Sequence, residues 1–168
     1  MATQTRSPGT ITNDAAFGAS AWSNPSNAGA SDNAYATATV FASPTTSQYL
    51  KGVNYGFTIP NGSTINSISY GPEVKGSGAN VVKDTRVRVV VGGSIGTNDY
   101  SDAGNWPTSD TVMAHDISAE APTVAQINAS DFGVAHAITW VSGAAPVGSV
   151  DDMQITVDYS APVAVVVY

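Results

Sequence analysis

Hydrophobic and polar residues alternate along much of the chain, which is the period of a β-strand with one buried face. These stretches are bounded by Gly, Pro, Asn or Ser, the residues that end strands and form turns. A helical period is found only in a short stretch, 121–129, where Pro122 suits the first helical position. We predict strands at 34–41, 49–59, 64–74, 81–91, 111–115, 133–141 and 150–159.

The arrangement of these segments predicts the fold class. About seven to nine strands separated by turn signals, with one short helix, are typical of an all-β protein. We therefore predict an antiparallel two-sheet sandwich or jelly roll. Residues 21–160 form the predicted domain, preceded by an extended N-terminal arm at 1–20. Residues 161–168 form a predicted C-terminal strand.

The two ends of the chain favour self-association. The segment 163–168 is apolar at every position, whereas a strand with one solvated face alternates. Either it is a central strand of its own domain, or its edges and faces are completed by another subunit. The arm has few core residues, so we expect a neighbouring subunit to order it. Candidate interface residues in the segment are Val163, Val165, Val166, Val167 and Tyr168.

Composition and charge exclude several classes of function. Charged residues make up 11% of the chain and the net charge is −7, so no broad basic surface exists for nucleic acid. The absence of cysteine excludes disulfides, thiolate metal sites and a cysteine nucleophile. Residues 1–12 lack the apolar core of a secretory signal, and no apolar run approaches the ~18 residues that span a bilayer. We expect neither nucleic acid nor membrane as a partner.

Two motifs that suggest catalysis lack the context that catalysis needs. Residues 92–96 match the G-x-S-x-G pattern around Ser94, but the segment that follows does not read as the helix of a nucleophile elbow. We interpret it as a glycine-rich turn. Asp151 and Asp152 are adjacent and would point to opposite faces of a strand. A turn at the start of a strand is a better interpretation than a catalytic carboxylate pair.

Histidines and a long acidic loop are the remaining candidates for chemistry. The loop at 98–116 carries Asp99, Asp102, Asp110 and the pair His115–Asp116, but lacks the spacing of a calcium-binding loop. A solvated acidic loop is favoured, with a structural calcium ion as the alternative. His136 reads as a satisfied or exposed strand residue. We predict no catalytic residue, cofactor or metal.

Three aromatic residues in predicted loops are candidates for a partner surface. Trp22, Tyr100 and Trp106 lie outside the predicted strands. Exposed aromatics of this kind favour protein partners or stack on sugar rings. The alternative is that they pack in the core.

Several segments, which together cover most of 22–159, resemble β-sandwich virion structural proteins of tailed bacteriophages. The resemblance lies in turn glycines, strand aromatics and a terminal strand, and it names no catalytic residue. The matching residues are Trp22-Ser-Asn-Pro-Ser-Asn-Ala28, Asp32, Tyr35-Ala-Thr-Ala38, Leu50, Gly56-Phe-Thr-Ile-Pro-Asn-Gly-Ser-Thr-Ile65, Ile68, Asp131-Phe-Gly-Val134 and Val150-Asp-Asp-Met-Gln-Ile-Thr-Val-Asp-Tyr159.

The resemblance implies a virion protein made in the host cytoplasm. We expect a capsid decoration (cement) protein, a homotrimer that bridges major capsid subunits on the outer surface of the head. The alternative is a tail-fibre, receptor-binding or carbohydrate-binding module that contacts host glycans.

Overall fold

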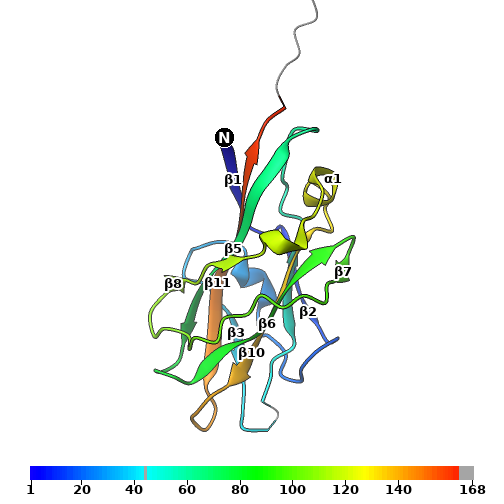
Figure 1. Cartoon of the computed structure of the whole chain (residues 1–168). Helices are drawn as coiled ribbons and strands as arrows, with labels where there is room; N and C mark the ends of the chain where they lie inside the picture. Colours follow the sequence, from blue (N-terminus) through cyan, green and yellow to red (C-terminus); the bar gives the residue numbers. More distant parts are fainter. Residues whose placement is uncertain (44, 163–168) are drawn as a thin grey trace, which may run out of the picture.

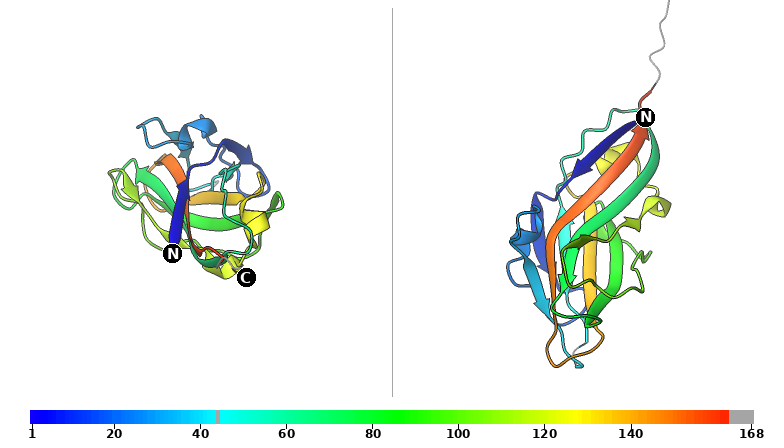
Figure 2. Two further views of the ribbon diagram at one scale, coloured as in Figure 1. Left: turned by 90° about the horizontal axis from the view of Figure 1, so that it is seen from above. Right: turned by 90° about the vertical axis from the view of Figure 1, so that its left-hand side faces the viewer.

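The computed structural model describes residues 1–43 and 45–162, and it confirms the all-β, two-sheet sandwich (Figures 1 and 2). The strands are β1 (Ala2–Arg6), β2 (Thr10–Asp14), β3 (Ala36–Thr39), β4 (Tyr49–Val53), β5 (Thr64–Gly76), β6 (Val82–Val91), β7 (Ser94–Ile95), β8 (Thr111–Val112), β9 (His115–Asp116), β10 (Gly133–Trp140) and β11 (Val147–Ser160). The helical turns are η1 (Pro25–Ala28), η2 (Ser118–Glu120) and α1 (Val124–Ile127).

Every strand pairing within the two sheets is antiparallel. The first sheet has the order β1-β11-β5-β8, with β3 also on β11 and β9 also on β5. The second sheet has the order β2-β4-β10-β6-β7. Apolar side chains from the facing sides of both sheets form the core, among them Leu50, Ile68, Val87, Val134, Ile138 and Ile155.

The long strands β5 and β11 form the backbone of the first sheet. They pair from Thr64 opposite Ser160 down to Gly76 opposite Gly148. Buried and half-buried residues alternate along most of both strands, as the sequence pattern predicts, but at 150–153 of β11 four residues in a row are buried. Their upper ends, together with β1, extend beyond the second sheet (Figure 1). This projecting end carries one wall of the groove described below.

The prediction of an N-terminal arm ordered only by a neighbour is wrong. β1 pairs with β11 over its whole length, and β2 pairs with β4 from Thr10 opposite Val53 to Asp14 opposite Tyr49. Both strands satisfy backbone groups at sheet edges that would otherwise lack partners. The segment after β2 packs on the outer face of the second sheet, where the centroid of the Phe17 ring lies 5.4 Å from that of the Tyr49 ring.

The turn at Gly92-Gly93 lies where the sequence predicts it, and the helix begins two residues later than predicted. Gly92 and Gly93 have φ of +58° and +75° and close the β6–β7 hairpin, which is the primed turn that glycine favours. The helix begins at Val124 rather than near Pro122, because Thr123 and Gln126 form a capping box. Of the C-terminal strand predicted at 161–168, residues 161 and 162 are described and are not in a strand, and 163–168 lie outside the described residues.

Candidate functional site

Trp22 and Trp106 are buried in the core, with 3% and 2% of their surface exposed. The Trp22 indole donates to the Gln48 carbonyl at 2.8 Å, and the Trp106 indole donates to Asp84 Oδ1 at 2.7 Å. Each loop folds back over the sandwich because the ring is apolar and its N–H finds an acceptor inside. Placing these two residues on a partner surface is therefore a prediction that the structure corrects.

Tyr100 is half-buried, and it does not join the two tryptophans in a patch. Its hydroxyl donates to Glu120 Oε2 at 3.0 Å, and Asn98 donates to the same carboxylate oxygen. Burial, together with Glu120, raises the pKa of the Tyr100 hydroxyl. The other predicted interface residues, Val163, Val165, Val166, Val167 and Tyr168, lie outside the described residues.

A buried polar network occupies the core between the two sheets. Asp84 Oδ1 accepts from His136 Nε2 at 2.8 Å as well as from Trp106. His136 Nδ1 and the Tyr70 hydroxyl are hydrogen-bonded at 3.0 Å. His115 Nε2 lies 3.5 Å from Asp84 Oδ2, while its Nδ1 donates to the Tyr100 carbonyl at 3.0 Å. Of the two alternatives predicted for His136, a satisfied or an exposed strand residue, the structure shows the satisfied one.

The charge states of the network follow from burial and neighbours. Burial acts to raise the pKa of Asp84, but the charge and hydrogen bond of His136, with contributions from His115 and Trp106, outweigh it and hold that pKa below its ordinary value. Burial, followed by the nearby His136, lowers the pKa of His115. His115 Nε2 makes no hydrogen bond, although Asp84 Oδ2 lies 3.5 Å away.

This network is closed to solvent. Tyr70 and His136 have no exposed surface, and Asp84 and His115 are 4% and 5% exposed. A substrate in solution cannot reach any of these side chains in this structure, so the geometry supports a structural role that joins the two sheets. Sequence reasoning missed Asp84 and Tyr70. The available signal was position, since Asp84 follows Val82, and Tyr70 follows Ile68, on the inward side of a strand.

The other candidates for chemistry do not assemble. Ser94 lies in the exposed β6–β7 hairpin, as a glycine-rich turn predicts. The carboxylates of Asp99, Asp102 and Asp116 each accept a backbone N–H two residues further along the chain, so each is engaged in its own turn. Within residues 1–43 and 45–162, no cluster of three or more His, Asp or Glu side chains is arranged to hold a metal ion.

Asp151 and Asp152 are not at the start of a strand, which corrects that interpretation. They lie inside β11, where the register against β5 skips a residue between Val150 and Asp152. Both carboxylates are buried. Asp151 accepts the backbone N–H of Asn33 at 3.1 Å, and Asp152 accepts the Ser7 hydroxyl at 2.9 Å. The pair therefore ties two loops to the first sheet.

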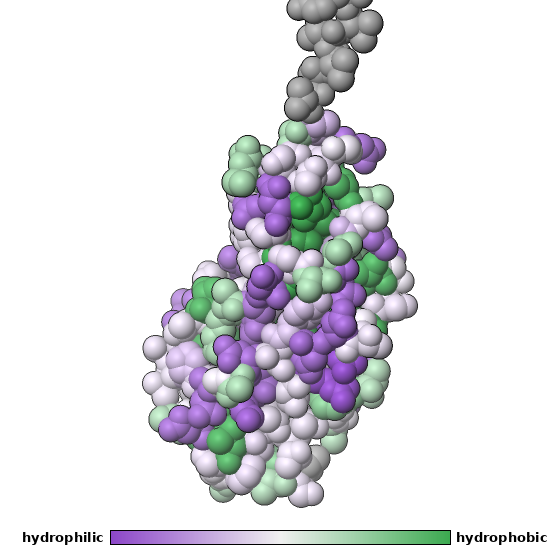
Figure 3. Space-filling model, in the orientation of Figure 1, coloured by the Kyte–Doolittle hydropathy of each residue, from purple (hydrophilic) through white to green (hydrophobic). Residues whose placement is uncertain are grey.

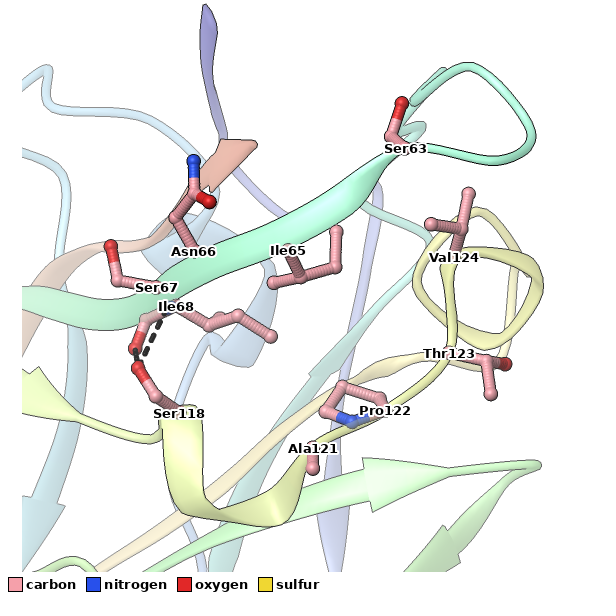
Figure 4. A pocket seen from close by; sticks show the side chains of 10 residues that line it. All are labelled: Ser63, Ile65, Asn66, Ser67, Ile68, Ser118, Ala121, Pro122, Thr123 and Val124. Atoms are coloured by element: carbon pink, nitrogen blue, oxygen red, sulfur yellow. Dashed lines mark hydrogen bonds between the residues drawn. The ribbon is translucent and has the colours of Figure 1, made fainter. Parts of the chain in front are cut away.

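A groove of about 420 Å³ opens between the start of β5 and the segment from η2 to α1 (Figure 4). Ile65 and Ile68 project from β5 toward Pro122 and Val124 on the opposite wall (Figure 4). None of the lining side chains carries a charge; they are Ser63, Ile65, Asn66, Ser67, Ile68, Ser118, Ala121, Pro122, Thr123 and Val124. Hydrophobic surface lies over this region of the molecule (Figure 3). We call it the β5–α1 groove.

One wall of the β5–α1 groove is a strand edge without a strand partner. On the side opposite β11, β9 pairs with β5 only at Ser69 and Tyr70, and β8 pairs only at Glu73 and Val74. The Ser118 hydroxyl and the Ile117 N–H then bond the backbone of Ile68. Among the described residues, no strand continues this side of β5 along 64–67. Such an edge can accept an added strand.

Neither a search for membrane-spanning helices nor comparison with known proteins assigns the chain to a class. None of the helices in the described part of the chain is long and apolar enough to cross a membrane. Comparison of the chain with protein-family models, with curated proteins and with solved structures found no match.

Proposed function

We propose that this chain is a non-enzymatic structural protein of a tailed-bacteriophage virion, where it acts as a capsid decoration protein. The observation that carries the proposal is the β5–α1 groove, an uncharged groove with apolar and small polar walls beside an unpartnered strand edge. It lies at the same end of the molecule as Ser160, the last residue of β11, which pairs with Thr64. A protein that works by binding other subunits needs such a surface, and it needs no reactive group.

Charge supports an outer position on the head. The net charge of −7 disfavours contact with packaged DNA, which is itself strongly negative. A decoration protein of this kind stabilises a head by burying surface against several capsid subunits at once, so that they resist internal pressure together. The resemblance of residues 22–159 to phage sandwich proteins points in the same direction.

The glycan-binding alternative has less support. It depended on exposed aromatic rings that stack on sugars. Trp22 and Trp106 are buried, and the Tyr100 hydroxyl is engaged by Glu120. A position on the tail fibre is an outcome that the following experiment distinguishes.

The test is to locate the protein in particles of the virus that encodes it. Purified particles are separated into heads and tails, and each fraction is probed with an antibody raised against the purified chain. We expect the chain in heads, accessible to gold-labelled antibody on intact particles. Heads stripped of it should rupture at a lower temperature and regain resistance when the purified chain is added back. Detection only in tails, or in neither fraction, would contradict the proposal.

A further inference from the structure

We propose that the β5–α1 groove binds the apolar segment 163–168 of a second copy of this chain, which adds to the free edge of β5 as a strand. The inference rests on the proposed function, because it names the first partner of the same groove. It depends on three features of the described residues: the chemistry of the groove, the length of the free β5 edge, and the place where β11 ends.

The chemistry of groove and segment is complementary. Ile65 and Val124, both half-buried, present apolar surface inside the groove, and the lining residues are uncharged. The segment Val-Ala-Val-Val-Val-Tyr is also uncharged and apolar at every position. A strand with two covered faces has this composition. One face would pack on the groove and the other on the neighbouring subunit, while backbone hydrogen bonds to β5 supply the register.

The dimensions agree as well. A strand advances about 3.3 Å per residue, so the six residues 163–168 span about 20 Å when extended. The free β5 edge, from Thr64 to Ser67, is about 13 Å long by the same measure. The segment is therefore long enough to cover the whole free edge.

The position of the end of β11 favours a groove filled by the segment of a second copy over one filled by the segment of the same chain. Ser160 is the last residue of β11 and lies opposite Thr64, the first residue of β5. Pro162 follows beside the Pro60–Gly62 turn, since a Cβ on Gly62 would lie 3.6 Å from the Pro162 Cβ. To enter its own groove, the chain must reverse immediately after Pro162. Tight reversals favour Gly, Pro, Asn or Asp; residues 161–168 contain only Pro162 of these, and it is followed by Val163, a residue type that favours strands.

Exchange of this segment between copies produces a closed assembly. If each copy donates to the next, three copies close a ring in which every groove is filled. This arrangement also accounts for the apolar segment without leaving it exposed, which would favour aggregation. The expected state in solution is a trimer or another closed oligomer.

The absence of cysteine allows a direct cross-linking test. One preparation carries Asn66→Cys at the groove and a second carries Val165→Cys in the segment. When they are mixed under oxidising conditions, we expect a disulfide between the two different chains, since this needs Cα atoms within about 7 Å. Ser109→Cys, at an exposed position outside the groove, replaces Asn66→Cys as the control and should give no cross-link to Val165→Cys.

The solution mass provides a second measurement. Val124→Asp places a charge in the groove, while Ala125→Asp places the same charge on the neighbouring exposed residue of α1, which does not line it. We expect Val124→Asp and deletion of 163–168 to raise the dissociation constant of the oligomer at least tenfold, with Ala125→Asp unchanged. Circular dichroism of each variant confirms that it is folded.

Several outcomes would overturn the exchange. They are a folded monomer for the full chain, no disulfide between the Asn66→Cys and Val165→Cys chains while a chain that combines both substitutions forms one within itself, and an oligomer that survives Val124→Asp and deletion. A monomer that is nevertheless present on heads would overturn this inference and leave the proposed function intact. An exchanged oligomer that is absent from particles would support this inference and contradict the proposed function.

Discussion

Replacing Asp84 by alanine tests the most connected interaction in the core. Asp84 is 4% exposed, and its Oδ1 accepts from both Trp106 Nε1 and His136 Nε2. Trp106 comes from the long loop after β7, His136 from β10 in the second sheet, and Tyr70, on the far side of His136, from β5 in the first sheet. Asp84→Ala therefore removes the acceptor that connects a loop to the two sheets.

The expected cost follows from the donors that lose their acceptor. A buried donor left without a partner costs about 1–3 kcal/mol. Two such donors, Trp106 Nε1 and His136 Nε2, give an expected loss of about 2–6 kcal/mol in the free energy of unfolding. A domain of this size has about 5–15 kcal/mol in total, so the variant should be close to unfolding at 37 °C. Asp84→Asn keeps one acceptor oxygen and should lose less.

Urea unfolding at pH 7 and 15 °C, followed by tryptophan fluorescence and circular dichroism, measures this loss. Asp14→Ala is the matched control, because Asp14 pairs with Lys51 at 3.1 Å where both side chains are about one quarter exposed. Its loss should be no more than about 1 kcal/mol. If Asp84→Ala costs no more than Asp14→Ala, the network does not hold the sheets together and the reasoning is refuted.

Three further predictions concern pH, backbone packing and helix capping. Because burial lowers the pKa of His115 in the folded state, the unfolded state binds the proton more readily, so stability should fall as pH drops from 7 through 6.5 toward 5; His115→Phe should flatten that slope in urea midpoints, and an unchanged slope would contradict it. Gly133→Ala should destabilise by about 1–3 kcal/mol or more, because its Cβ would lie 1.9 Å from the Gly52 carbonyl oxygen, whereas Gly78→Ala should be neutral or stabilising by up to about 1 kcal/mol; equal urea midpoints for the two variants would refute this. Thr123→Ala removes the cap of α1 and should cost about 1 kcal/mol in urea unfolding, and no loss would show that tertiary packing alone holds the helix.

The sequence by itself determined the strands and the turns that separate them. Alternation along 64–74 and 81–91 predicts β5 and β6 because the side chains of a strand point to opposite faces in turn. Gly92-Gly93 predicts the hairpin because glycine adopts positive φ without strain. These are local properties of the backbone. The uncharged, apolar composition of 163–168 is equally visible without a structure.

Tertiary structure decided which residues meet. Asp84, His136 and Tyr70 are far apart along the chain, and only the packing of one sheet on the other brings them into one network. Trp22 and Trp106 read as loop aromatics because local pattern does not show where a loop folds back. The β5–α1 groove likewise depends on where β9 stops pairing with β5. Contacts over such sequence separations come from packing, which no local period encodes.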